Sequence, residues 1–376
     1  MQNTRSFNLP FVSQPFLVLA AFAISVLAQS TTITPLVDQK FTYPDLPQQV
    51  DPVATGRGPQ SGYNICNSGT EGPDSLCQTA FVNNLADWCV WGPPTPDSTI
   101  ADTESETVAW CSQPGHGTRV IPPGALTGVQ FLRAPAYIQI TGHIDQTKID
   151  MQAGDSGGEM DPHGADLRGN PLGGLLFSNG FPASNGDNST YTQVIQWTNF
   201  MGGGVFCFKA CDPTGSDAAN YCQHSFDRIG CSYNAPAAYE DGVFLSCDSD
   251  NQDFPGVYTD ASGNVQTYTQ PGTSAGVIST LPYEPKIPAT SNCVTYQSTD
   301  LYQASQVTTA TSSTQSTTQE ASPTSSANSD AVSPRAALSI SSTASPTASV
   351  HTSGGDILAA ISWQYMFLCI IISAFF

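Results

Sequence analysis

The stretch VQFLRAPAYIQIT, residues 129–141, decides the expected fold of this chain. It contains two short runs, Val129–Phe131 and Tyr137–Thr141, that are rich in β-branched and aromatic residues. Pro135 lies between the runs, and proline is a residue that separates strands. The pattern therefore predicts two short β-strands with a connection between them.

Runs of the same kind recur along the chain, with Gly and Pro between them. They are Gly173–Ser178, Tyr191–Phe200 and Gly204–Lys209. Farther on, Gly256–Thr259 and Val265–Thr269 are expected to pair as a hairpin, because the Asp and Gly residues of the connection suit a turn. Many short strands with turn signals indicate a mainly β fold, either a sandwich or a compact barrel.

Two segments are predicted to be short helices that disulfides fasten to the core. In Pro73–Trp91, apolar residues recur at spacings of three to five and would form one stripe on a helix. Ser216–Ile229 is the second segment, with Ser or Asp available to cap its start and Gly230 to end it. Both segments contain cysteines.

The cysteines predict a disulfide framework. The chain has eleven, and Cys369 lies in the C-terminal tail. The other ten form two even groups, which are Cys66, Cys77, Cys89 and Cys111, and then Cys207, Cys211, Cys222, Cys231, Cys247 and Cys293. In an oxidising compartment we expect five disulfides, each within one group. No metal site is expected, because the cysteines lack a second ligand pair at zinc spacing.

The two ends of the sequence predict secretion and membrane attachment. Residues 1–28 contain a basic residue, an apolar run and the short residues Val26 and Ala28 before a cleavage expected after Ala28, which is the order of a secretory signal peptide. Residues 354–376 end in an uncharged apolar run, and small residues precede it, as in a GPI-anchor signal. We expect the lipid to be attached at Ser353, with Ser349 as the alternative site. A retained transmembrane span is the alternative, although no basic residue follows the run.

Composition divides the remaining sequence into three parts. Residues 29–61 are rich in Pro and Gln and are expected to form an extended lead-in. Residues 62–297 carry the ten cysteines and the strand signals, so they form the expected globular ectodomain, with an N-glycosylation sequon at Asn188. Residues 298–353 hold 27 Ser or Thr among 56 residues, which predicts a disordered, O-glycosylated stalk.

The charge of the chain excludes one class of partner. The 31 Asp and Glu residues outnumber the 11 Lys and Arg residues, which gives a net charge of −20. A surface of this charge repels phosphate backbones, so we expect no nucleic-acid binding. It is compatible with cations, basic partners or neutral glycans. We expect no cofactor.

Residues 154–166, GDSGGEMDPHGAD, form the candidate binding loop. Its candidate residues are Asp155, Glu159, Asp161, His163 and Asp166. Clustered carboxylates on a Gly-rich loop could hold Ca²⁺, contact a ligand, or supply the acid and base of glycoside cleavage. Arg, Lys and backbone N–H groups could instead satisfy them in a structural turn, and we favour this interpretation. We assign no catalytic residue.

The first five residues of this loop, GDSGG, copy the motif around the nucleophile of trypsin-like serine proteases. The resemblance ends there, since Glu159 stands where that family has Pro. His143 is only 13 residues before Ser156, which is too close for that family's chain order. A motif requires its structural context, so we do not expect a protease.

Several longer strings together resemble one fungal family. They are IPPGALTGVQF (121–131), GGEMDPHGADLRGNPLGG (157–174), QWTNFMGG (196–203), CFKACDP (207–213), YCQHSFDRIGC (221–231) and DNQDFPGVYTDASG (250–263). Spread over residues 62–294, they are similar to strings of the fungal macrophage-activating glycoproteins. The resemblance implies a secreted, GPI-anchored surface glycoprotein and carries over no catalytic residue.

These observations predict a non-catalytic glycoprotein at the extracellular face of the plasma membrane and in the cell wall, with a structural or interaction role. Its expected partners are the membrane, through the GPI anchor, and cell-wall glycans. Two alternatives stay open. A glycan-binding module requires exposed aromatic residues, for which the candidates are Trp88, Trp91, Trp110 and Trp197. A secreted glycoside hydrolase requires a cleft with an acid–base pair.

Overall fold

Residues 129–141 form the centre of the larger of two β-sheets. β5 (Leu126–Arg133) and β6 (Tyr137–Ile144) run antiparallel, with Phe131 opposite Ile140. Adjacent side chains such as Phe131 and Leu132 are both buried, at 1% and 0% exposure, so the pair is covered on both faces. The short connection at Pro135 closes when Ala134 N donates to Tyr137 O at 2.9 Å.

The computed structural model describes residues 33–182 and 187–302. The other strands are β1 (Thr79–Asn84), β2 (Asp87–Gly92), β3 (Val108–Cys111), β4 (Arg119–Val120), β7 (Gly158–Met160), β8 (Leu175–Ser178), β9 (Thr192–Val194), β10 (Trp197–Gly202), β11 (Val205–Cys211), β12 (Phe244–Ser249), β13 (Val257–Thr259), β14 (Val265–Thr267) and β15 (Thr290–Thr295). The helices are short, and they are α1 (Ile100–Thr103), α2 (Ala218–Tyr221), α3 (Cys231–Asn234), α4 (Ser298–Leu301) and the 3-10 turns η1 (Leu36–Asp38), η2 (Gln146–Ile149) and η4 (Thr273–Ala275).

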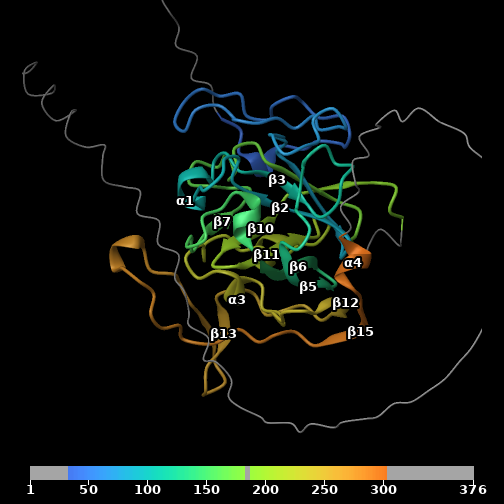
Figure 1. Ribbon diagram of the computed structural model, residues 1–376. Coiled ribbons are helices and arrows are strands. Elements are labelled where there is room, and N and C mark those ends of the chain that lie inside the picture. Colours follow the sequence, from blue (N-terminus) through green and yellow to red (C-terminus); the bar gives the residue numbers. More distant parts are fainter. Residues whose placement is uncertain (1–32, 183–186, 303–376) are drawn as a thin grey trace, which may run out of the picture. The chain divides into compact units, whose positions relative to one another are not determined.

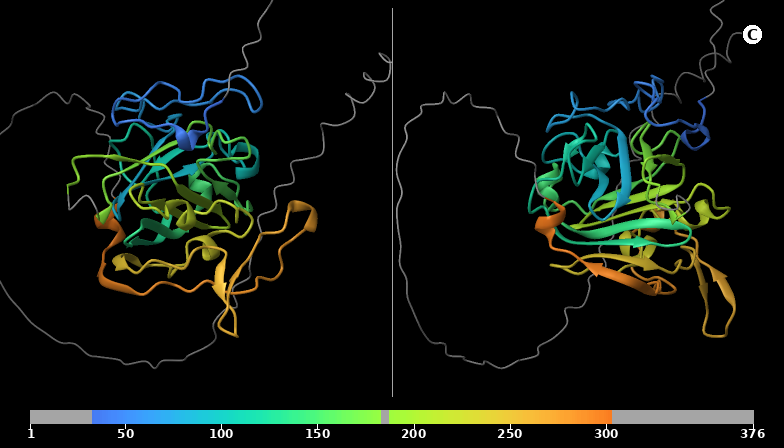
Figure 2. Two further views of the ribbon diagram at one scale, coloured as in Figure 1. Left: turned by 180° about the vertical axis from the view of Figure 1, so that it is seen from behind. Right: turned by 90° about the vertical axis from the view of Figure 1, so that its right-hand side faces the viewer.

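Two mixed sheets pack face to face around one core. The larger has the order β15-β12-β5-β6-β11-β10-β7, and the smaller has the order β4-β3-β2-β1-β8-β9. Trp88 of β2 stacks on Phe206 of β11, with ring centroids 5.0 Å apart, and Trp91 N donates to Asn199 Oδ1 of β10 at 2.8 Å. In Figures 1 and 2, β2 and β3 lie over the layer that contains β5, β6 and β11. The mainly β prediction is confirmed, in the form of a sandwich.

The helix predicted for residues 73–91 is wrong. This segment forms β1 and β2, which pair antiparallel with Val82 opposite Trp88. Both strands are buried almost throughout, because the larger sheet covers one face and Tyr43 packs edge-on against Phe81, with ring centroids 5.3 Å apart. A strand buried on both faces loses the alternation that marks a half-exposed strand. Its apolar residues then fall at spacings that also fit a helical stripe.

The helix predicted for residues 216–229 is much shorter than expected. α2 covers only Ala218–Tyr221, and α3 begins after Gly230. Cys222 ends α2 and forms a disulfide with Cys211 of β11. This covalent bond fixes the chain to the sheet after one turn, and the next residues run in turns along the sheet instead of continuing a helix.

Five disulfides join the ten cysteines of the body. They are Cys66–Cys77, Cys89–Cys111, Cys207–Cys231, Cys211–Cys222 and Cys247–Cys293. Every bond lies within one of the two sequence groups. Cys89 and Cys111 are direct partners in the register of β2 and β3, so this bond ties two neighbouring strands. Disulfides of this kind form and persist mainly in oxidising compartments.

Two segments that composition placed outside the ectodomain contact its core. In the lead-in, Leu36 is 4% exposed, and Asp51 forms a buried ion pair with Arg168. At the other end, Tyr302 Oη donates to Leu85 O at 2.7 Å and its ring meets Trp88 edge-on. The folded body therefore includes residues before 62 and extends through Tyr302.

The remaining expectations about the ends fall outside the part of the chain that the structure describes. These are the signal peptide, residues 303–353 of the stalk, Ser353 and the apolar tail. Among residues 33–182 and 187–302, no helix combines the length and the apolar character needed to cross a membrane.

Candidate functional site

Gly157, near the start of the candidate binding loop, lies where two strands approach each other closely. β7 pairs with β10, and Gly157 has a φ of +80°. A Cβ at Gly157 would lie 1.5 Å from Met201 O, so only glycine fits. Asp155 accepts hydrogen bonds from Gly157 N at 2.9 Å and from Ile100 N, at the start of α1, at 2.8 Å. Its carboxylate therefore joins the loop to α1.

Asp161 and Asp166 also bind their own chain. Asp161 Oδ1 accepts from the backbone N–H groups of His163 at 2.7 Å and Gly164 at 2.9 Å. Asp166 accepts from Arg57 Nη2 at 2.5 Å and from Nε at 3.1 Å. Burial alone would raise the pKa of Asp166, but the hydrogen bond and charge of Arg57 outweigh burial and lower that pKa.

Glu159 differs from the other carboxylates of the loop. It lies in β7 opposite Phe200 of β10, and it is 6% exposed. Neither carboxylate oxygen has a hydrogen-bond partner within the described residues. Burial, and then the negative charges of Asp161 and Asp227, raise the pKa of Glu159 well above its ordinary value. Glu159 therefore keeps its proton at pH values where an ordinary glutamate has lost it.

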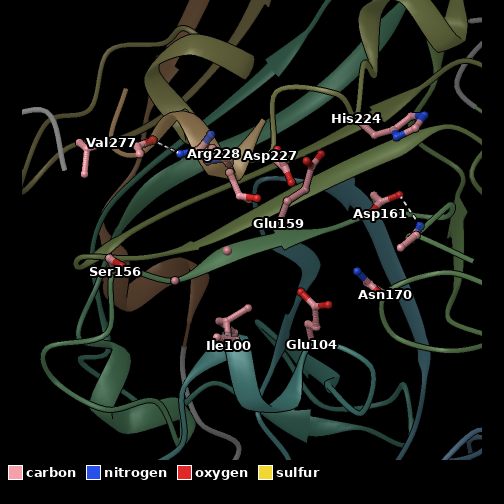
Figure 3. Close-up of a pocket in the computed structure, with 17 residues that line it drawn as sticks. Ile100, Glu104, Ser156, Glu159, Asp161, Asn170, His224, Asp227, Arg228 and Val277 are labelled. Carbon is pink, nitrogen blue, oxygen red and sulfur yellow. Dashed lines mark hydrogen bonds between the residues drawn. The ribbon is translucent and has the colours of Figure 1, made fainter. Parts of the chain in front are cut away.

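Glu159 lines a pocket of about 660 Å³, shown in Figure 3. The walls come from five separate parts of the chain, which are α1 with Glu104, the candidate binding loop, Asn170, residues 224–228 and residues 273–277. Burial raises the pKa of Glu104, and Asp161 and Asp227 add to the increase against the opposing charge of Arg57. Four carboxyl groups therefore share this pocket.

The basic and imidazole groups of the pocket are engaged by protein atoms. Arg228 Nη1 donates to backbone carbonyls in residues 271–272, with Gly272 O at 3.0 Å, and its guanidinium also bonds a carbonyl farther along the same wall. The His224 ring stacks on His163 with centroids 3.8 Å apart. Partial burial and the neighbouring His163 lower the pKa of His224, so its imidazole is neutral at neutral pH.

The structure separates the five predicted loop residues into different roles. Glu159 and Asp161 line the pocket, whereas Asp155 and Asp166 make the structural contacts described above. His163 reaches the pocket only indirectly, by stacking on its wall. Within the described part of the chain, no three His, Cys, Asp or Glu side chains converge as ligands for one metal ion.

Glu104 and residues 224–228 were not predicted as site residues from the sequence. Glu104 is a single carboxylate at the end of a one-turn helix and has no motif around it. Residues 224–228 reach the pocket because disulfides at Cys222 and Cys231, on either side of them, tie this connection to β11. Only the disulfide pairing could have pointed to their position, and the sequence left that pairing open.

Two histidines that precede the GDSGG segment in the sequence, His116 and His143, do not serve Ser156 as a catalytic base. Ser156 is exposed and lines the pocket. His143 Nδ1 lies 2.8 Å from Asp241 Oδ1, and His116 Nε2 lies 2.6 Å from Asp87 Oδ1. Both histidines therefore pair with carboxylates elsewhere.

The four candidate tryptophans are buried and cannot form a sugar-binding platform. Trp88 and Trp91 are 0% exposed, Trp197 is 1% exposed and Trp110 is 6% exposed. They belong to the shared core of the two sheets. By contrast, Asn188 is exposed in a loop, so its sequon is accessible, and its glycosylation stays a prediction.

Two relatives from the fungus Mycosarcoma maydis are similar to this chain. Appressorium protein ROW1 is 47% identical over 204 residues, which are 54% of this chain and 47% of ROW1. Appressorium protein ROW2 is 42% identical over 207 residues, which are 54% of this chain and 69% of ROW2. The chain belongs to the family of appressorium protein ROW2. It spans about half the length of ROW1.

Membership in the ROW2 family defines the fungal relationship more directly than the sequence strings did. The relatives are appressorium proteins, and the narrower resemblance to macrophage-activating glycoproteins stays a prediction. No family model matches the chain. No solved structure matches it either. The site must therefore be interpreted from its own geometry.

Proposed function

We propose that this chain is a non-catalytic surface protein of a fungal cell with a structural or interaction role at the appressorium. The observation that carries this proposal is the five-disulfide sandwich, because a body held by five disulfides is suited to the oxidising exterior of the cell. The ROW relatives supply the appressorium as the cellular setting. Three of the five loop residues bond their own chain through carboxylates, which favours a structural loop over a catalytic one.

The attachment to the cell is the finer part of the proposal. Lipid would be added at Ser353 after removal of residues 354–376, and residues 303–353 would form a glycosylated stalk. The protein would then stand at the extracellular face of the plasma membrane and reach the cell wall. Cell-wall glycans are the proposed partners there, since the acidic surface disfavours anionic polymers.

Phospholipase treatment tests this attachment. A phospholipase specific for GPI linkages should release the protein from washed membranes. A variant truncated after Ser353, which lacks the signal, should appear in the medium without treatment. Detection of residues 363–376 in the membrane-bound mature protein by mass spectrometry would refute GPI attachment and support a retained span.

One observation favours a second candidate function, a secreted glycoside hydrolase. Glu159 has a raised pKa in a pocket that also holds Glu104 and Asp227, and a carboxylic acid beside a carboxylate is the arrangement that glycoside cleavage requires. Incubation with fungal and plant wall polysaccharides, followed by measurement of reducing ends, tests it. Turnover that Glu159→Gln abolishes would replace our proposal, and no turnover by the unmodified protein would reject this candidate.

A further inference from the structure

The strongest unexplained feature of the molecule is the carboxyl group of Glu159. It is 6% exposed, it lines the pocket, and both of its oxygens lack hydrogen-bond partners within the described residues. A buried polar group without a partner is unfavourable, and most buried side-chain polar atoms in proteins are bonded. The fold gives partners to the other carboxylates of the candidate binding loop, such as Asp161, and leaves the carboxyl group of Glu159 without one. A ligand that donates hydrogen bonds would satisfy it.

The charged groups around Glu159 favour a ligand that carries a positive charge. Glu104, Asp161 and Asp227 lie on the same pocket walls, and Asp161 and Asp227 act electrostatically on Glu159. The basic group on the wall, Arg228, already donates to backbone carbonyls of residues 271–276. These carboxylates would repel an anionic ligand, whereas they would attract a cation with N–H donors.

The pocket suits a small organic molecule better than a bare metal ion. No three ligating side chains converge on one point among the residues that the structure describes. The volume of about 660 Å³ is instead in the range of sites for small organic molecules. Ile100 and Val277 supply apolar contact, and Asn170 supplies a neutral polar group. Figure 3 shows Glu159 and Asp227 among these side chains.

We propose that this pocket binds a primary ammonium group carried by a small polar molecule, with Glu159 and Asp227 accepting its hydrogen bonds. An ammonium has three N–H donors and one positive charge, which matches a partnerless carboxyl group surrounded by other carboxyl groups. Two sources share this chemistry, an amino sugar and an alkyl amine. The inference deepens the proposed interaction role and rests on the pocket being a binding site.

Isothermal titration of the secreted, disulfide-bonded protein with matched probes tests the proposal. Glucosamine and N-acetylglucosamine differ in the charged amine, and cadaverine carries the amine without the sugar. We expect binding of glucosamine or cadaverine in the millimolar range or tighter, and at least about tenfold weaker binding of N-acetylglucosamine, since a hydrogen bond to a charged group accounts for that factor. Tighter glucosamine binding identifies an amino sugar as the source, and tighter cadaverine binding identifies an alkyl amine.

Three variants test whether the amine binds in this pocket. Glu159→Gln and Asp227→Asn should each weaken amine binding about tenfold or more. Glu240→Gln makes the same Glu-to-Gln substitution at an exposed residue that does not line the pocket, and it should leave binding unchanged. Asp227 is exposed, so its variant remains informative if Glu159→Gln does not fold.

Three results would overturn the proposal. They are equal affinity for glucosamine and N-acetylglucosamine, no amine binding in the millimolar range, and binding that neither pocket variant weakens. The phospholipase experiment is independent of these variants. If no amine binds, the proposed attachment to the cell surface is unaffected. If phospholipase does not release the protein from membranes, the proposed amine site in the pocket is unaffected.

Discussion

Asp51→Asn should destabilise the protein more than the position of Asp51 in a Pro- and Gln-rich lead-in suggests. Arg168 Nε donates to Asp51 Oδ2 at 2.6 Å and Nη2 donates to Oδ1 at 3.0 Å, and the two side chains are 1% and 6% exposed. Hydrogen bonds and charge from Asp51 raise the pKa of Arg168, so the guanidinium stays charged. Removal of the Asp51 charge leaves a buried guanidinium whose remaining close partners are backbone carbonyls of residues 53–58, and breaking a buried ion pair in this way costs about 3–5 kcal/mol.

This loss corresponds to a decrease in Tm of roughly 6–20 °C, at about 2–4 °C per kcal/mol for a body of this size. Urea unfolding of the oxidised protein, followed by tryptophan fluorescence, measures it. The matched control is Asp166→Asn, since the Asp166–Arg57 pair is exposed at 34% and 28% and should contribute less than about 1 kcal/mol. Equal losses for the two variants would refute the conclusion that Asp51 and Arg168 fasten the lead-in to the body.

Three further predictions test the site and the framework. Burial raises the pKa of the Glu159 carboxyl group above 4.5, so the stability that its protonated form contributes is complete below pH 4.5 and is lost as the pH rises through the folded-state pKa. In urea unfolding, Glu159→Gln should therefore be as stable as the unmodified protein near pH 4 and more stable than it at pH 7. Ser156 should not react with a fluorophosphonate probe, and labelling detected by mass spectrometry would restore the protease hypothesis. Peptide mapping under non-reducing conditions should find the five disulfides, and a Cys111–Cys207 bond would contradict the separation into two groups.

The sequence could predict the strands where the local pattern and the tertiary environment agree. Residues 129–141 and 204–209 are rich in strand-forming residues, and they lie in the larger sheet as β5, β6 and β11. Residues 73–91 show where the local pattern fails. Their burial depends on the second sheet and on Tyr43, neither of which a local pattern contains. Spacing alone could not distinguish a doubly buried strand from a helical stripe.

The packing of the lead-in could not be predicted for a different reason. Pro- and Gln-rich composition predicts little secondary structure, and residues 39–61 indeed contain only isolated bridges and turns. Irregular backbone can nevertheless be firmly packed when single side chains are fixed. Asp51 pairs with Arg168, and Gln60 Oε1 accepts from Val50 N at 2.9 Å. Such contacts depend on particular pairs of side chains and backbone groups, and the Asp51–Arg168 pair joins residues 117 positions apart, so composition could not reveal them.

The candidate binding loop shows how structural and functional carboxylates can be distinguished. The sequence could identify the cluster but could not sort its members, because Asp155, Glu159 and Asp161 are all acidic residues on one Gly-rich segment. Hydrogen bonding sorts them. Asp155 and Asp161 each accept two backbone N–H bonds, so their removal would leave donors of the protein unpaired.

Glu159 differs from these two residues, because neither of its carboxyl oxygens accepts a hydrogen bond from the described residues. Structural carboxylates stabilise the fold through their partners, whereas a buried carboxyl group without partners destabilises it. Proteins retain such destabilising groups mainly where a ligand or a reaction uses them. Asp155 joins the loop to α1, and Asp161 fixes the turn after β7, so the two structural carboxylates hold the strand that presents Glu159 to the pocket. The loop is therefore structural in most of its residues and a candidate binding element at Glu159.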